Sequence, residues 1–333
     1  MAKPARRESA AIRWIRISIY HRRIVVKSFY PVSQPQIVSV FSPAKINLFL
    51  AVTGRRADGY HELVSVVAPL TFGDELTVEI GEGRPETGGQ FSLECDDPQV
   101  PVDGRNLVLK AAEVFATATG WKAPAKFRLA KRVPVGAGLG GGSSNATAAL
   151  RALNQLSGAR LSPAALMALA AGVGSDCPLF LSGGPVVIRG RGEQVEALPA
   201  AAARRLRGRS VLLFKPGFGV STAWAYEQMV AGAPRAYISA AEAGRRLAGW
   251  IEGQADAAEL LFNNLEPVVF RKYLALPVLL EHLQVRFGLA PRMSGSGSAC
   301  FALLPAGARV EELKAAIVEA WGSVSFVQIA AIA

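Results

Sequence analysis

The order of strand-like and helix-like segments along the chain predicts an α+β fold in two domains. The 333 residues are enough for two domains with sizeable buried cores. Hydrophobic residues make up 50% of the chain and charged residues 19%, which is ordinary for a globular protein. Strand-like runs are mixed with pairs of helical patterns, without the regular strand–helix alternation that a doubly wound sheet requires.

The first half of the chain opens with an extended segment, residues 37–53, in which polar and apolar side chains alternate. Pro43 lies inside this segment and cannot donate a ladder hydrogen bond, so a bulge or a strand edge is expected there. The other elements expected in this half are strands at 64–70, 75–80 and 125–131 and a helix at 106–119.

A glycine-rich loop at 134–142 leads into the second half of the pattern. An Ala- and Leu-rich helix is expected at 143–157, and Ser162-Pro163 predicts the start of another, because serine caps helices and proline fits the first turn. The remaining elements are strands within 185–214 and at 291–303 and 323–329, and helices at 221–231, 239–250, 277–287 and 308–321. The domain boundary is expected within 184–210, which gives an N-terminal extension (1–37), an N-terminal domain (38–195) and a C-terminal domain (196–333).

The positive charge of the chain is concentrated at its N-terminus. Residues 1–40 carry +7 of the formal net charge of +11, so the remainder is close to neutral and a nucleic-acid-binding role is not expected. Arginines interrupt every apolar run in this extension, so neither a signal peptide nor a membrane span is predicted. A dispensable extension, or a start codon placed too early, is a better explanation than an organellar transit peptide.

The cysteines and histidines predict neither disulfides nor a metal cluster. No two cysteines form a C-x-x-C pair, which fits a reducing cytoplasm, and the histidines are too dispersed to gather round a metal. The residues concerned are Cys95, Cys177, Cys300, His21, His61 and His282.

The most informative local motif is the run from Pro134 to Ser144 (PVGAGLGGGSS). Its small residues let the backbone approach a ligand closely, and it opens a helix whose first N–H groups and positive end favour phosphate. A Walker A loop is excluded, since no lysine lies between Lys131 and Lys215. A dinucleotide-binding fold is also excluded, because the chain has no Asp or Glu from residue 114 to residue 175. The remaining alternative is a glycine-rich turn without a ligand.

Asp176 and Lys45 are the candidate catalytic residues. Asp176 is the first carboxylate after the loop and precedes an apolar run that would hold it in place, so it could accept a proton from a substrate hydroxyl. On this pattern alone, a helix cap is an equal explanation. Lys45 and Asn47 share one strand face and suit a carboxylate or phosphate partner, although a surface lysine stays possible. A second glycine run, 292–301, suggests another backbone wall around the same ligand.

These motifs, taken together, resemble the GHMP superfamily of galactokinases, homoserine kinases, mevalonate kinases and phosphomevalonate kinases. The resemblance covers residues 38–330 and is closer to the kinases that act on 4-diphosphocytidyl-2-C-methyl-D-erythritol, because the RADGYH core is specific to that subfamily. It rests on SPAKINLFLAVTGRRADGYHELVSVV (42–67), PVGAGLGGGSSNATAALRALN (134–154), GSDCPLF (174–180) and MSGSGSACFAL (293–303).

The resemblance implies a GHMP kinase fold with the active site in the cleft between its two domains. It implies that ATP and Mg²⁺ are used to phosphorylate the 2-hydroxyl of 4-diphosphocytidyl-2-C-methyl-D-erythritol in the non-mevalonate isoprenoid pathway. The sequence does not identify the residues that would bind Mg²⁺. Asp176 would be the base, Lys45 would orient it, and Asn47, Tyr60, His61 and Tyr226 would bind the substrate. The ATP phosphates would lie against Pro134, Val135, Gly136, Ala137, Gly138, Leu139, Gly140, Gly141, Gly142, Ser143 and Ser144.

Two other functions compete with this interpretation. One is a sister kinase acting on homoserine or mevalonate, against which the GRRADGYHEL segment argues, because those substrates have no base to stack on. The other is a nucleic-acid-binding protein that uses the basic N-terminus. We expect a cytoplasmic enzyme with a small-molecule substrate and neither a nucleic-acid nor a membrane partner; the sequence leaves the oligomeric state open.

Overall fold

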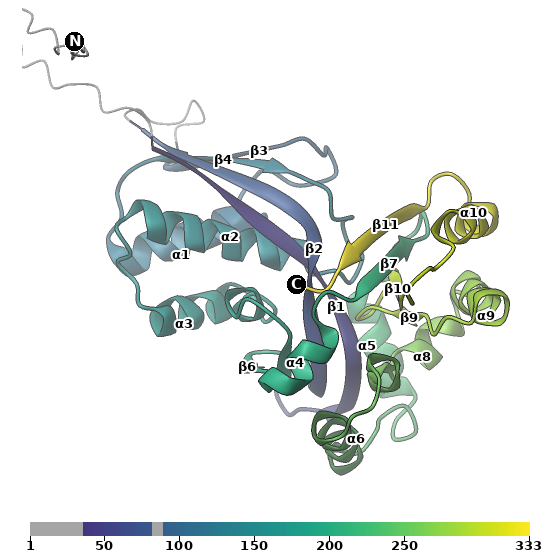
Figure 1. Ribbon diagram of the computed structural model, residues 1–333. Coiled ribbons are helices and arrows are strands. Elements are labelled where there is room, and N and C mark those ends of the chain that lie inside the picture. The colour runs from purple at the N-terminus through teal and green to yellow at the C-terminus, as the bar shows by residue number, and fades with distance from the viewer. Residues whose placement is uncertain (1–35, 82–88) are drawn as a thin grey trace, which may run out of the picture. The chain divides into compact units, whose positions relative to one another are not determined.

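The computed structural model describes residues 36–81 and 89–333, which belong to one compact unit (Figure 1). The extension expected at 1–37 lies outside these ranges except for its last two residues, which begin β1. The α+β class is confirmed. Among the described residues no helix is both long and apolar enough to cross a membrane.

The larger sheet in the described part of the chain has seven strands. Its order is β3-β4-β2-β1-β8, and the β5–β6 hairpin pairs with β2. The strands are β1 (Gln36–Arg55), β2 (His61–Ile80), β3 (Phe91–Cys95), β4 (Ala125–Ala130), β5 (Val186–Gly190), β6 (Gln194–Ala197) and β8 (Phe262–Asn263).

The two strands expected at 64–70 and 75–80 are one continuous strand, β2. Gly73 permits this, because a Cβ at that position would lie 2.3 Å from the Ser42 carbonyl oxygen, where β1 and β2 pass closely. The irregularity expected at Pro43 is present as a register shift between Pro43 and Lys45. Lys45 is therefore the first paired residue of β1 after this irregularity.

Helices α1 (Leu107–Thr119), α2 (Gly141–Leu156) and α3 (Pro163–Val173) lie together beside the large sheet (Figure 1). They share a core with the apolar residues of β2 and β4, including Phe127, which is fully buried. Ser162 is the N-cap residue of α3, as the Ser162-Pro163 pair predicted. The short 3₁₀ helix η1 (Pro178–Leu181) follows α3.

The smaller sheet in the described ranges has four strands in the order β11-β7-β10-β9. Alternate side chains of β7 are buried on opposite faces, one face toward the large sheet and the other toward α9 and α10. The strand expected at 291–303 is two strands, β9 and β10, separated by residues 294–299 of the second glycine run. The bounds are β7 (Ser210–Lys215), β9 (Arg292–Met293), β10 (Cys300–Leu303) and β11 (Phe326–Ala331).

The later part of the chain also contributes to the large sheet. β8 pairs in parallel with β1, and Ile332 forms a bridge with Leu70. The domain division at 195/196 stays a prediction. The remaining helices are α4 (Ala200–Leu206), α5 (Thr222–Ala231), α6 (Ala240–Glu252), α7 (Ala257–Leu260), α8 (Glu266–Phe270), α9 (Ala275–Phe287) and α10 (Val310–Trp321).

Candidate active site

One cavity of about 940 Å³ is lined by all the residues that the sequence nominated for catalysis and for substrate binding. They come from β1, from the turn before β2 and its first residue, from the turn before η1 and from α5. The residues are Lys45, Asn47, Tyr60, His61, Asp176 and Tyr226. Residues 166 positions apart in the sequence, such as Tyr60 and Tyr226, therefore face one space.

A second hollow of about 350 Å³ is lined by the glycine loop from Pro134 to Ser143. Gly138, Gly140 and Ser143 line both spaces, so the two adjoin. Ser144 does not line either: it is buried, and its hydroxyl accepts a hydrogen bond from Ser42 (2.8 Å). The sequence analysis did not predict that residues before and at the start of α1 also line this hollow: Val100, Pro101, Arg105, Asn106 and Leu107. The only sequence signal in this segment was Asn106, which precedes a helical pattern.

The glycine loop has a conformation that only glycine adopts easily. Gly136, Gly138 and Gly140 have φ angles of 62°, 77° and 71°. A Cβ on Gly138 would lie 2.3 Å from the Ser294 carbonyl oxygen. No side chain of the described residues caps α2 at Gly140, so the N–H groups of its first turn face the loop as an anion-binding end.

Lys45 is held against this loop. Its backbone N–H donates to the Leu139 carbonyl (2.9 Å), and its Nζ donates to the Gly138 carbonyl (2.8 Å) and to Asn47 Oδ1 (2.7 Å). The side chain is only 5% exposed, and burial lowers the pKa of Lys45, while the negative charge of Asp176 acts in the opposite direction. No ion pair joins Lys45 to Asp176 among the described residues, and the two charges interact across the cavity that both line.

Asp176 lies in the turn between α3 and η1. Thr147 of α2 fixes this turn by donating to the Cys177 carbonyl (2.8 Å). Asp176 caps neither neighbouring helix, since the N-cap residues are Ser162 and Cys177, and the helix-cap alternative is therefore wrong. The carboxylate lines the cavity together with Tyr226, and burial of Tyr226, followed by the negative charge of Asp176, raises the pKa of Tyr226.

His61 and Tyr226 form the aromatic end of the cavity. Their ring centroids are 4.6 Å apart, and His61 Nε2 is buried without a hydrogen-bond partner among the described residues. Burial, and then the positive charge of Arg55, lower the pKa of His61, so a neutral ring is favoured. Tyr60 is 55% exposed and lies under the Arg191 guanidinium, 5.1 Å from the ring centroid.

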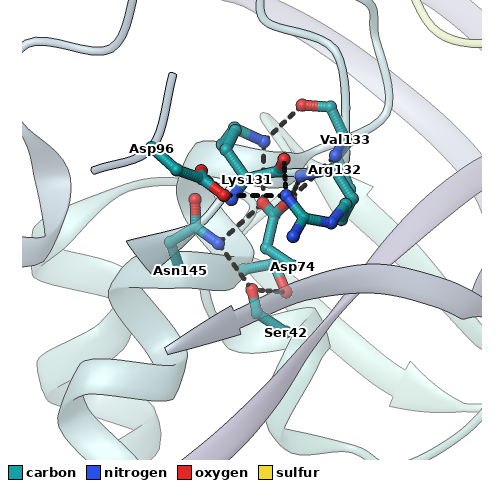
Figure 2. Close-up of polar contacts among 8 residues, drawn as sticks. Ser42, Asp74, Asp96, Lys131, Arg132, Val133 and Asn145 are labelled. Carbon is teal, nitrogen blue, oxygen red and sulfur yellow. Dashed lines mark hydrogen bonds and ion pairs between the residues drawn. The ribbon is translucent and has the colours of Figure 1, made fainter. Parts of the chain in front are cut away.

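A buried carboxylate anchors the segment that enters the glycine loop (Figure 2). Asp74 accepts hydrogen bonds from the backbone N–H groups of Arg132 (2.6 Å) and Val133 (2.7 Å), from Lys131 Nζ (2.7 Å) and from Asn145 Nδ2 (2.9 Å). Asn145 also donates to Ser42 on β1. Strands β1 and β2, the loop entry and the first turn of α2 are thus tied together beneath the loop.

The second glycine run braces the loop from the other side. Ser294 Oγ donates to the Gly138 carbonyl (3.1 Å), and Ala299 N–H donates to the Ala137 carbonyl (3.0 Å). Gly295 and Ser296 line the main cavity. In residues 36–81 and 89–333 no group of three or more His, Cys, Asp or Glu side chains could hold a metal ion.

Comparison with known proteins agrees with this arrangement. The family model "GHMP kinases N terminal domain" matches residues 106–184, and "GHMP kinases C terminal" matches residues 243–323. Among solved structures, a homoserine kinase from Cytophaga hutchinsonii shares the fold at 18% identity, with a TM-score of 0.65 over 91% of this chain and 97% of that one. The two family models and the shared fold are those of the GHMP kinases.

More similar relatives narrow this class. A 4-diphosphocytidyl-2-C-methyl-D-erythritol kinase from Pelotomaculum thermopropionicum is 40% identical over 80% of this chain and 89% of its own length. The kinase of that name from Methylacidiphilum infernorum is 39% identical over 81% and 88%. A solved 4-(cytidine 5'-diphospho)-2C-methyl-D-erythritol kinase is 32% identical, with a TM-score of 0.69 over 89% of this chain and all of its own. The chain belongs to the 4-diphosphocytidyl-2-C-methyl-D-erythritol kinase family.

Proposed function

We propose that this protein transfers the γ-phosphoryl group of ATP to the 2-hydroxyl of 4-diphosphocytidyl-2-C-methyl-D-erythritol, a step of the non-mevalonate isoprenoid pathway. The observation that carries the proposal is the single cavity in which Asp176 and Lys45 face His61 and Tyr226, next to the hollow of the glycine loop. The acceptor alcohol would lie by Asp176, the cytosine by His61 and the two tyrosines, and the ATP phosphates along the loop.

In this proposal Asp176 accepts the proton of the substrate hydroxyl as its oxygen attacks the γ-phosphorus. The new O–P bond forms while the bond from the γ-phosphorus to the ADP oxygen breaks. Two of the three N–H groups of the Lys45 ammonium are used by Asn47 and Gly138, so the third is left to stabilise the developing alkoxide. The protein contributes positioning and electrostatics rather than covalent chemistry.

Mg²⁺ would accompany the nucleotide. Magnesium is commonly held by substrate phosphates with one or two carboxylates, and the cavity offers Asp176 and Glu227 rather than a full protein cage. Its role would be to neutralise charge on the phosphates. The proposal includes a cytoplasmic location, which the free thiols of Cys95, Cys177 and Cys300 favour, and it involves no nucleic-acid or membrane partner.

The test is ADP release by the wild-type protein and by Asp176→Asn with a panel of alcohols. We expect turnover of the cytidine compound, with poor turnover of its uridine analogue, mevalonate and homoserine, because a site that pairs with a polar base edge rejects analogues lacking it. Asp176→Asn should keep ATP affinity and lose about 10²-fold or more in kcat. Equal rates on the cytidine and uridine compounds would contradict the substrate assignment. Normal turnover by a folded Asp176→Asn protein would remove Asp176 from the mechanism.

A further inference from the structure

The cavity contains positive charge that the roles proposed above do not use. Its cationic side chains are Lys45, Arg55 and Arg191. Lys45 is buried against the glycine loop and already bonded to Asn47 and Gly138. Arg55 forms neither an ion pair nor a side-chain hydrogen bond with any described residue, in contrast to Arg56, which is paired with Asp58 (3.1 Å) and Glu62 (2.9 Å). Two guanidinium groups therefore remain for a ligand.

Both arginines flank the aromatic end of the cavity. Arg55, the last residue of β1, lies directly across from His61, the first residue of β2. After burial, its charge helps to lower the pKa of His61, and it opposes the burial that raises the pKa of Tyr237. Arg191 lies at the tip of the β5–β6 hairpin, over the Tyr60 ring. The ends of three neighbouring strands thus bring the two cations to the Tyr60–His61 corner.

The hairpin tip also reaches the catalytic end. A Cβ built on Gly192, the residue after Arg191, would lie 3.6 Å from Asp176 Oδ1. The turn that carries Arg191 therefore lies beside the Asp176 carboxylate, while the Arg191 guanidinium lies over Tyr60. Its only ion pair among the described residues is a long one, with Nε 4.0 Å from Glu193 Oε2.

We infer that Arg55 and Arg191 bind the diphosphate of the substrate. This inference rests on the proposed function: in that substrate a diphosphate joins the polyol, which would lie at Asp176, to the nucleoside, which would lie at His61. Guanidinium groups donate paired, charge-assisted hydrogen bonds to phosphate oxygens. The two arginines would then set the distance between base and acceptor alcohol, and they would favour a nucleoside diphosphate ester over an uncharged nucleoside or a small hydroxy acid.

The experiment measures the affinities of CDP and of cytidine by titration calorimetry, with a saturating non-hydrolysable ATP analogue and Mg²⁺ present so that CDP does not enter the ATP site. The proteins are wild type, Arg55→Gln, Arg191→Gln and the control Arg189→Gln. Arg189 lies on the same hairpin as Arg191 but does not line the cavity. Each cavity variant should lose about tenfold in CDP affinity, the scale of one charge-assisted hydrogen bond, and keep its cytidine affinity. The control should match wild type.

Arg55→Lys and Arg191→Lys give a second measurement that a folding defect would not mimic. They should recover part of the CDP affinity, because the charge is kept while the planar fork is lost. The preference of wild type for CDP over cytidine should also shrink as salt is raised. In turnover, the KM of the cytidine substrate should rise in both glutamine variants while the KM of ATP stays unchanged.

The outcomes separate this inference from the proposed function. If wild type prefers CDP to cytidine and both glutamine variants keep that preference in full, the arginines do not bind the diphosphate, and the proposed substrate still stands. The inference is also overturned if Arg189→Gln loses as much CDP affinity as they do. If wild type binds neither cytidine nor CDP, the proposed substrate is wrong and the inference falls with it.

Discussion

Lys45 shows how a single side chain depends on a glycine distant in the sequence. Gly140 has φ of 71°, and a Cβ there would lie 2.9 Å from Lys45 Cγ and 2.9 Å from Phe180 Cζ. The lysine also bonds twice to the loop that contains Gly140, through Leu139 and Gly138. The orientation of the ammonium group is therefore determined by the absence of a side chain at position 140.

Gly140→Ala should consequently impair catalysis beyond its cost in stability. A left-handed φ costs an alanine about 1–2 kcal/mol, and the new methyl group must in addition displace Lys45. Because a misplacement of about 1 Å can cost 10²-fold, we expect kcat to fall by about that factor. Steady-state kinetics together with thermal unfolding would measure both effects.

Gly120→Ala is the matched control. Gly120 also has a left-handed φ, 69°, but no other atom of the described residues lies within 4 Å of a Cβ built there. It should show the loss of stability with normal kcat. If both variants lose stability equally and both keep normal kcat, Gly140 does not control the position of Lys45.

Strand β2 supports the glycine loop through Asp74, just after the close contact at Gly73. The carboxylate is fully buried and accepts four hydrogen bonds, three of them from the segment 131–133 that leads into the loop (Figure 2). The fourth comes from Asn145 in the first turn of α2. One strand therefore determines where the loop begins and where its helix starts.

Asp74→Asn should loosen this anchor. The change would leave the Lys131 ammonium, 6% exposed, without its buried counter-charge, which typically costs about 3–5 kcal/mol. We expect the free energy of unfolding to fall by about 3 kcal/mol. We also expect the KM of ATP to rise more than the KM of the acceptor, 4-diphosphocytidyl-2-C-methyl-D-erythritol. Urea unfolding and the two KM values are the measurements.

Asp96→Asn is the comparison, since Asp96 also accepts hydrogen bonds from Lys131 N (2.6 Å) and Arg132 Nη1 (2.8 Å) but is 47% exposed. Exposed pairs contribute about 0–1 kcal/mol, so this variant should stay near wild type. Similar losses in both variants would mean that burial of Asp74 is not what anchors the loop.

The two sheets are joined around the end of β8. Asn263 Nδ2 donates to the carbonyls of Met293 (2.8 Å) and Gly295 (2.9 Å), while β8 itself pairs with β1. Glu266 accepts the Met293 backbone N–H (2.8 Å) at the same junction. Burial raises the pKa of Glu266 from 4.5 to about 7, opposed by this N–H and by the charge of Arg292.

This raised pKa makes the junction sensitive to pH. Between pH 4.5 and about 7 the folded protein keeps a proton on Glu266 that the unfolded chain has lost, so its contribution to stability falls as pH rises through this window. Glu266→Gln retains an acceptor for Met293 and carries no charge. At pH 8 the variant should be more stable than wild type by about 1–3 kcal/mol, and near pH 4.5 the difference should disappear.

Urea unfolding at both pH values would measure this difference, with other titrating groups cancelling between the two proteins. A variant that is less stable than wild type by the same amount at both pH values would contradict the prediction. It would show that the Glu266 carboxylate stabilises the junction by hydrogen bonding alone.

Local patterns in the sequence predicted those features that short segments encode by themselves. The bulge at Pro43 follows from a missing N–H, the start of α3 from Ser162-Pro163, and the exposed backbone of the glycine loop from its small residues. Lys45, Asn47 and Asp176 were recognisable because a polar side chain next to apolar or glycine-rich neighbours needs a partner. Their roles in catalysis stay predictions.

Features that depend on contacts between segments distant in the sequence could not be predicted from local sequence patterns. Strand β2 is continuous because Gly73 meets β1, and Asp176 is no helix cap because α2 and the following turn place it at the cavity. Nothing local marks Asp74 or Glu266 as buried, and nothing local distinguishes Arg55, which has no ion pair among the described residues, from the paired Arg56. Burial and charge pairing are properties of the surroundings of a side chain, and only the packing of the two sheets supplies those surroundings. The sequence by itself therefore determined the chemistry available and the local backbone, whereas the tertiary structure decided which of these groups share one cavity.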